Sequence, residues 1–377
     1  MAVSTITGMG ELKIEAYEPC PCGSEKKFKF CCYSKAKSSQ PKKQDYPISR
    51  INHMLTKSWQ DTDYKTCMAF DKEKCDKTIK GAHSIQNNRI LNRISEDGHV
   101  YCFKAEADEN GLNTIFKKIS KNKASTFFGF CDLHDTELFL PIEQKEYNQE
   151  PIQNFLFAFR AHALEFHKKQ RGLKNFQNIV KTFPYVVFDP MFVNGYRVAE
   201  FDVNDNSNDY SIFNEYFSTG NFAEMRTFYY KLDFEVDFAV STAFTVQFDL
   251  EQNEINDIYF DKTDKRMPSI YLNVYPVEKG TNIILSYHLK DDQKYKKYFD
   301  QLEALSTEKL LEHLNYLIIE YTENVFFSPS FVEGLTDKQK ESILKSFGSS
   351  IFILDKLDLM MKDNYYNFNL FSGKSTV

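Results

Sequence analysis

The sequence predicts an α+β protein of several domains, and three observations carry that prediction. Four cysteines stand within thirteen positions near the N-terminus, cysteine and histidine residues recur between 67 and 135, and apolar residues at strand and helix spacings fill 151–377. A chain of 377 residues is longer than one hydrophobic core usually supports, so two or three domains are expected. We therefore expect units at 1–45, 46–150 and 151–377.

The composition is that of a folded chain without a strong overall charge. Hydrophobic residues make up 42% of it, with 35 Phe and 22 Tyr, and the net charge is -6. Any attraction to nucleic acid must therefore come from local basic patches. No apolar run approaches the roughly twenty residues that span a bilayer, and the start lacks a signal-peptide pattern, so we expect no membrane association and a cytoplasmic location.

The N-terminal cysteines have the spacing of a metal site. Cys20 and Cys22 are separated by one residue between stiffening prolines, a Gly-Ser step allows a turn, and Cys31 and Cys32 return the chain to the same point. Four thiolates at tetrahedral positions suit zinc. Disulfides are the alternative, but neighbouring cysteines and a Cys-x-Cys step are poorly shaped for local bridges. The first predicted cofactor is therefore a structural zinc ion.

Residues 19–32 resemble the SEC-C motif, which occurs at the tail of the preprotein translocase motor ATPase and at one end of many otherwise unrelated bacterial proteins. The resemblance implies a zinc knuckle that docks on a protein partner. Lys26, Lys27, Phe28 and Lys29 are expected to be exposed and to form that docking surface. The polar, Lys/Ser/Gln-rich run at 34–45 that follows is expected to be a linker.

A second four-ligand set is spread over the middle unit. Cys131 and His134 have the Cys-x-x-His spacing of a knuckle, and the upstream Cys67 and Cys75 complete a second structural zinc site. A short helix is expected at 84–94 and a strand at 99–105 within the long segment between the two halves of the set.

This arrangement resembles the treble-clef plan of the HNH, or ββα-metal, nuclease family. His83, at the end of a hairpin strand, stands where that family places the histidine that activates water. The resemblance implies a second, catalytic divalent ion, magnesium, manganese or nickel, with Asn87, His99 and Asp135 as its candidate ligands. Alternatives remain beside each assignment: a zinc scaffold without catalysis, a helix-capping role for His83, and a turn position for His99.

The C-terminal unit follows strand and helix periodicities in turn. Phe155, Phe159 and Phe166 lie on one face of a helix, with Arg160 expected to point outward. Residues 278–281 are expected to form a hairpin turn, and Ser306 to cap a helix. Helices are expected at 154–170, 307–321 and 336–347, and strands at 234–240, 241–250, 269–275 and 282–289. Together these elements predict an antiparallel sheet packed on helices.

Two functions of different class follow. The first is a metal-dependent endonuclease acting on nucleic acid, in which the C-terminal unit senses a trigger or forms a homo-oligomer; the HNH resemblance implies a role in bacterial defence against phage. The second is a non-catalytic adaptor that recruits protein or ribosomal partners through the knuckle. The nuclease requires His83 and a weakly bound metal ion, whereas the adaptor requires only the zinc ligands.

Overall fold

One antiparallel sheet organises most of the chain. The computed structural model describes residues 13–39, 54, 57–76, 78–108, 111–257, 266–349 and 368–371. Seven strands lie in the order β3 (Gly111–Ser120), β2 (His99–Asp108), β9 (Val325–Phe327), β6 (Phe238–Phe244), β7 (Ile270–Val277), β8 (Gly280–His288) and β5 (Met225–Leu232). Each neighbouring pair is antiparallel. The sheet thus takes strands from both sides of residue 150, where a domain division was expected.

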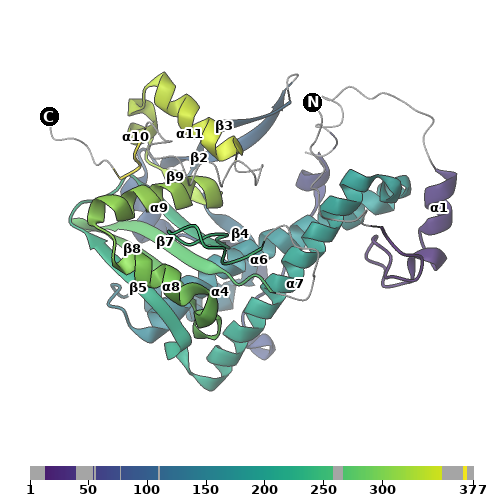
Figure 1. Ribbon diagram of the computed structural model, residues 1–377, viewed down its shortest axis with the longest axis horizontal. Coiled ribbons are helices and arrows are strands. Elements are labelled where there is room, and N and C mark those ends of the chain that lie inside the picture. The colour runs from purple at the N-terminus through teal and green to yellow at the C-terminus, as the bar shows by residue number, and fades with distance from the viewer. Residues whose placement is uncertain are drawn as a thin grey trace.

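Helices cover both faces of this sheet (Figure 1). Two long helices, α6 (Pro151–Thr182) and α7 (Pro190–Thr219), pack on one face, and α8 (Asp292–Glu303), α9 (Thr307–Tyr321) and α11 (Asp337–Ser349) pack on the other. Strand β8, the sixth of the seven, is buried at all of its positions because helices cover both of its faces. The predicted α+β class is therefore confirmed.

A small hairpin unit lies beside the main sheet. Strands β1 (Ile79–His83) and β4 (Thr126–Cys131) form a separate antiparallel pair, and α4 (Asp132–Leu138) follows β4 directly. Its apolar side chains join the core formed with α6 and α7. The remaining short elements are η1 (Phe28–Phe30), α1 (Tyr33–Ser38), η2 (Lys72–Lys74), η3 (Asn87–Leu91), α3 (Asn92–Ile94), α5 (Leu140–Glu143), η4 (Pro184–Phe188), η5 (Phe222–Glu224), η6 (Leu289–Asp291) and α10 (Pro329–Gly334).

Several predicted elements are confirmed at or near their expected positions. The turn between β7 and β8 has Lys279 at a φ of 56°, and the Ser306 hydroxyl accepts a hydrogen bond from the Lys309 N–H at the start of α9. The segment at 84–94 is helical over its second part, and β2 begins at the predicted residue.

The strand predicted at 234–240 is wrong in its first half, because β6 begins only at Phe238. Side chains hold the preceding residues in a bend: the Glu235 carboxylate accepts a hydrogen bond from the Lys279 N–H at 3.0 Å, and the Val236 N–H donates to the Thr281 hydroxyl at 3.0 Å. These local bonds compete with strand pairing. Similarly, β6 ends at Phe244, short of the strand expected over 241–250.

The linker predicted at 34–45 is also wrong at its beginning. Residues Tyr33–Ser38 form α1, and Ala36 is fully buried against Val180 and Val187 of the α6–η4 region. A single small apolar residue in a polar run gives little sequence signal for this contact. Residues 40–45 lie outside the described part of the chain.

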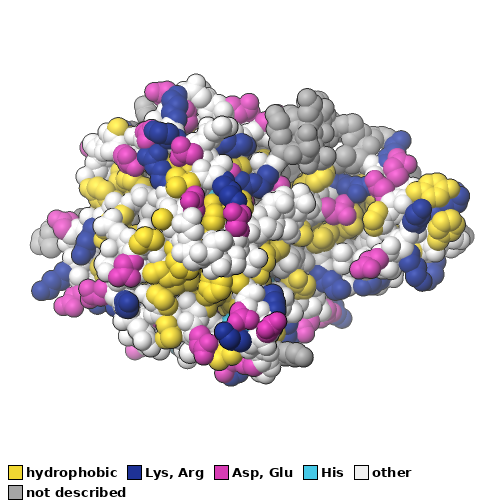
Figure 2. Space-filling model, turned by 90° about the horizontal axis from the view of Figure 1, so that it is seen from below, with side chains coloured by type: hydrophobic (Ala, Val, Ile, Leu, Met, Phe, Trp, Pro, Cys, Tyr) yellow, Lys and Arg dark blue, Asp and Glu magenta, His cyan; other side chains and the backbone are white. Residues whose placement is uncertain are grey.

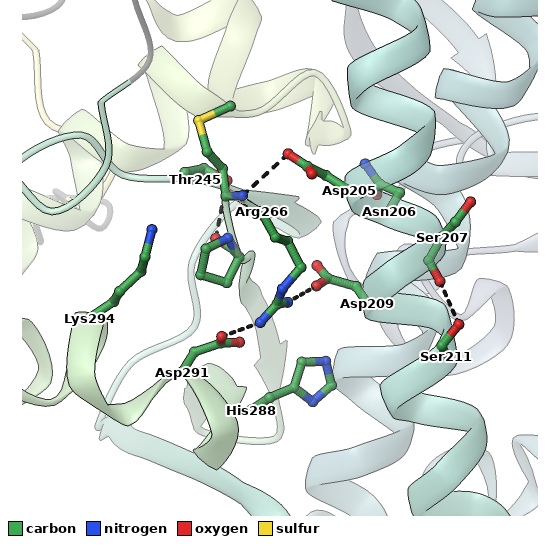
Figure 3. Close-up of polar contacts among 12 residues, drawn as sticks. Asp205, Asn206, Ser207, Asp209, Ser211, Thr245, Arg266, His288, Asp291 and Lys294 are labelled. Carbon is green, nitrogen blue, oxygen red and sulfur yellow. Dashed lines mark hydrogen bonds and ion pairs between the residues drawn. The ribbon is translucent and has the colours of Figure 1, made fainter. Parts of the chain in front are cut away.

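A buried polar network ties α7 to the segment after β8 (Figure 3). The Arg266 guanidinium lies between the carboxylates of Asp209 and Asp291 and pairs with both. Beneath it, the Tyr271 hydroxyl contacts His288 Nε2 at 3.0 Å. Because the two carboxylates share one cation, removing Arg266 would leave buried charges unpaired.

His162, which has no zinc-protease spacing with Glu165 and His167, is packed in the core. It is 0% exposed, and the rings of Phe159, Phe166 and Phe213 surround it. Neither of its ring nitrogens has a hydrogen-bond partner among the described residues. Burial lowers the pKa of His162 from 6.5 to about 3.

We therefore expect His162→Leu to reduce the amount by which the protein loses unfolding free energy at acid pH. Below pH 6.5 the unfolded chain gains a proton at this position and the folded chain does not, which costs about 1.4 kcal/mol per pH unit. The free energy of unfolding, measured with urea at pH 7.5 and at pH 4.5, should fall between these two values by about 2.7 kcal/mol less in the variant than in the parent. Exposed His99→Gln is the matched control, and parallel pH profiles for parent and His162→Leu would contradict the expectation.

Candidate functional site

The four N-terminal cysteines converge around a tight turn. Cys20 and Cys22 precede η1, Cys31 and Cys32 follow it, and their sulfur atoms all lie within 4.8 Å of one another. The Cys22–Cys31 and Cys31–Cys32 Sγ distances are 3.6 and 3.8 Å. Zinc–sulfur bonds of about 2.3 Å in a tetrahedron place the sulfurs about 3.8 Å apart. The cluster therefore has dimensions that fit a zinc ion.

The donor chemistry fits the same ion. All four thiols are free rather than paired in disulfides. Burial raises the pKa of Cys20 to about 11, so its thiolate needs a neighbouring cation at neutral pH. A divalent cation such as Zn²⁺ supplies that charge. When the ion binds, each thiol releases its proton.

The knuckle packs onto the far end of the α6–α7 hairpin. Gly23, at a φ of +72°, lies so close to Gln177 that an added Cβ would be 2.5 Å from its Oε1. Phe28 is only 2% exposed, which contradicts its predicted place on a docking surface. Its ring instead joins the small core shared with Val180 and Val187. The exposed aromatic residues at this tip are different ones.

Tyr17 and Phe30 are 60% and 70% exposed and meet edge to face, with ring centroids 6.5 Å apart. The Lys27 and Lys29 ammonium groups lie 5.5 and 5.1 Å from the centroid of the Tyr17 ring. Figure 2 shows hydrophobic and basic side chains together at this end of the molecule. We call these four residues the knuckle tip.

Deleting residues 1–39 is expected to leave the two large cores folded but to loosen the end of the α6–α7 hairpin. Val180 and Val187 would become exposed, and the ion pair between Arg197 and Glu18 would be lost. Hydrogen exchange should show lost protection near residues 176–190, with protection of β7 and β8 unchanged. The variant Phe30→Ala is the control, because its exposed ring supports no core, and unchanged exchange in the deletion would refute the packing.

The second cluster is assembled around the hairpin unit. Cys131 is the N-cap residue of α4, and His134 lies in the first turn of that helix. His134 Nδ1 lies 3.2 Å from Cys131 Sγ and 3.3 Å from Cys67 Sγ. With Cys75, after η2, the four ligand atoms lie within 4.8 Å of one another. Burial raises the pKa of Cys131 to about 11, so this donor set also fits a dication.

His83 and Asp135 share the same electrostatic neighbours. Burial lowers the pKa of His83, and the nearby Arg160 guanidinium lowers it further. Burial raises the pKa of Asp135 to about 6, and Arg160 acts to lower it. Glu143 interacts with both side chains. His83, at the end of β1, and Asp135, in α4, are therefore influenced by the same two charged groups.

Three predicted catalytic residues carry a buried polar atom without a hydrogen-bond partner among the described residues. These atoms are His83 Nε2, Asn87 Oδ1 and Asp135 Oδ1. The His83 ring interacts with the main chain of Asn122, and the Asn87 amide donates to the Asn122 side-chain oxygen at 2.9 Å. One ring nitrogen and two oxygens are thus left as available ligands or proton acceptors.

His99 has a different environment. It is the exposed first residue of β2, and its Nδ1 lies 2.7 Å from the Asp97 carbonyl oxygen. Asp97 and Gly98 both have positive φ angles, 48° and 72°. This geometry favours the turn alternative for His99, and we leave it out of the proposed catalytic centre.

Arg160 is the site residue that sequence reasoning missed. It was expected to point outward from α6, but it is buried, pairs with Glu143 and lies 4.1 Å from the centre of the Phe139 ring. Its position among apolar neighbours at helical spacing was the available signal, since a lone arginine on such a face has to find a partner.

Comparison with known proteins identifies the first module only. Four cysteines on a compact basic loop are typical of the class of small modules called zinc knuckles. A protein-family model, the SEC-C motif, matches residues 18–34, which contain all four of these cysteines. No curated protein and no solved structure matches the chain. Within the described residues, no helix is long and apolar enough to cross a membrane.

Proposed function

We propose that the chain is a metal-dependent, HNH-like endonuclease with its catalytic centre on a treble-clef-like unit formed by β1, β4 and α4. The observation that carries the proposal is the shared surroundings of His83 and Asp135, on adjacent elements of a unit held by a four-ligand cluster. Such a centre positions a base and metal-binding oxygens on a rigid scaffold.

His83, Asp135 and Asn87 would have different roles in phosphodiester hydrolysis. Neutral His83 accepts a proton at Nε2 from the attacking water, and its lowered pKa keeps the ring neutral at cellular pH. Asp135 and Asn87 offer oxygens to magnesium, manganese or nickel. When bound, such an ion neutralises charge that develops on the phosphate.

The remaining modules would support this centre. Zinc in both cysteine clusters would hold the local folds, and the knuckle tip would recruit a protein partner. The sheet and its outer helices would sense a trigger or form a homo-oligomer. Defence against phage in a bacterial cytoplasm is the setting that the HNH resemblance suggests.

The second candidate, a non-catalytic adaptor, is favoured by the knuckle tip. Tyr17 and Phe30 are large exposed aromatic residues beside two lysines, a composition typical of binding surfaces. An adaptor would need this surface and both clusters, but neither His83 nor a weakly bound ion.

Purified protein incubated with DNA or RNA tests the proposal directly. Cleavage is expected to require added magnesium, manganese or nickel and to persist after repurification to constant zinc content. If no single-stranded or duplex substrate is cut with any of the three ions, the adaptor remains the better explanation.

A further inference from the structure

A groove of about 610 Å³ opens between the helical segment η3–α3 and the end of β7 and β8 where the turn joins them. Its helical side includes Arg89 on η3, and its sheet side includes Tyr275 and Asn282. Tyr147, on the segment before α6, lines the same space. The volume lies within the range of small-ligand sites, about 300–1,000 Å³.

Positive charge in this groove is incompletely matched. Among the described residues, Arg89 donates to the main-chain oxygens of Glu143 and Lys145, each at 3.0 Å, and pairs with no carboxylate. Within the described part of the chain, Lys145 and Lys231 form no ion pair with a carboxylate. Arg93 also lines the groove, but it pairs with Glu235 at 3.2 Å. The acids lining it, Glu146 and Glu278, leave an excess of cations.

Aromatic and amide groups lie between these cations. Tyr147 is half-buried, and its ring lies 5.0 Å from Tyr229 and 5.7 Å from Phe157. The exposed Asn88 side chain, which carries an amide, also lines the groove. Cations that hold phosphates, a ring that stacks on a base and amides that bond base edges are the groups that bind single-stranded nucleic acid.

A small internal space lies next to the groove. It has a volume of about 10 Å³, shares Gln86, Ile90 and Phe157 with the groove, and is lined also by Arg160 and Ser84. Ser84 follows His83 in the chain, and Arg160 is the cation that acts on both His83 and Asp135. The groove therefore adjoins residues that surround the proposed base, and the space between them is about the size of one water molecule.

We propose that this groove holds a single-stranded segment of the nucleic-acid substrate, with Arg89, Lys145 and Lys231 on phosphates and a base stacked on Tyr147. This inference deepens the proposed function and rests on it for identifying the bound strand as the substrate. A duplex would keep its bases stacked internally and present no base face to Tyr147.

Binding without cleavage tests the groove independently of catalysis. The probe is a fluorescein-labelled oligothymidylate of about ten nucleotides, measured by fluorescence anisotropy over a range of salt concentrations without added divalent metal. For Lys145→Gln/Lys231→Gln, the slope of log affinity against log salt should fall by about 1.4. Tyr147→Ala should weaken binding about tenfold, and Tyr147→Phe should restore it.

Lys296→Gln, on α8, is the matched control and should bind as the parent does. The outcomes of this experiment separate the groove from the catalytic proposal. Groove variants with unchanged affinity and salt slope would overturn the groove even if the parent cleaves nucleic acid. Weakened groove variants of a protein that cleaves nothing would support the groove and defeat the endonuclease. Equal affinity for a duplex of the same length, or no binding by the parent, would overturn the single-strand assignment.

Discussion

His83→Ala is expected to reduce phosphodiester cleavage at least about a hundredfold while zinc content and melting temperature remain those of the parent. The imidazole would be the group that accepts the proton of the attacking water, and Nε2 carries no other hydrogen bond among the described residues. Single-turnover cleavage with saturating metal measures this chemical step. Elemental analysis of the same preparation establishes that the zinc clusters are intact.

The pH dependence provides an independent check on the same residue. Because burial and Arg160 lower the pKa of His83, the acid limb of the parent's cleavage profile should lie below pH 6.5. His99→Gln, at an exposed turn, is the matched control and should retain activity. Loss of zinc in His83→Ala would make His83 a structural ligand, and undiminished cleavage would remove it from the mechanism.

Cys131→Ser is expected to have the largest effect on stability. The parent should carry about two zinc ions per chain, and this variant about one, with a loss of unfolding free energy on the order of 4 kcal/mol or more. Cys131 is fully buried between β4 and α4, in the core that includes Phe130 and Phe159. Losing its metal would therefore disturb the middle of the molecule.

Cys22→Ser is the matched comparison. It should also lose one zinc ion but cost less stability, because its cluster belongs to the small core at the end of the α6–α7 hairpin rather than to either large core. Elemental analysis and thermal unfolding of the two variants measure both effects. A parent with one zinc ion or none would defeat the second zinc assignment, and equal melting losses would contradict the different roles of the two modules.

The first cysteine cluster, and the Cys131–His134 half of the second, could be predicted because the information is local. Cys20, Cys22, Cys31 and Cys32 lie within one turn of chain, and the Cys131–His134 step is completed in the first turn of one helix. Regular elements with a single dominant period, such as α9, were predicted for the same reason.

Features that depend on distant partners could not be predicted. The pairing of β2 with β9 joins residues more than two hundred positions apart, and nothing in either strand's pattern specifies that partner. Arg160 points inward because its guanidinium forms an ion pair with Glu143 and lies over the Phe139 ring. Phe28 is covered by a helix end that follows it by about one hundred and fifty residues.

The long helix α6 fixes the distance between the proposed catalytic centre and the zinc knuckle. Arg160 lies beside the proposed catalytic centre and Val180 beneath the knuckle, twenty residues further along one uninterrupted helix. At 1.5 Å per residue, the two points are held about 30 Å apart. A partner bound to the knuckle would therefore be held at a fixed distance from His83. If that partner were itself attached to the nucleic acid, this distance would determine where the proposed endonuclease cuts.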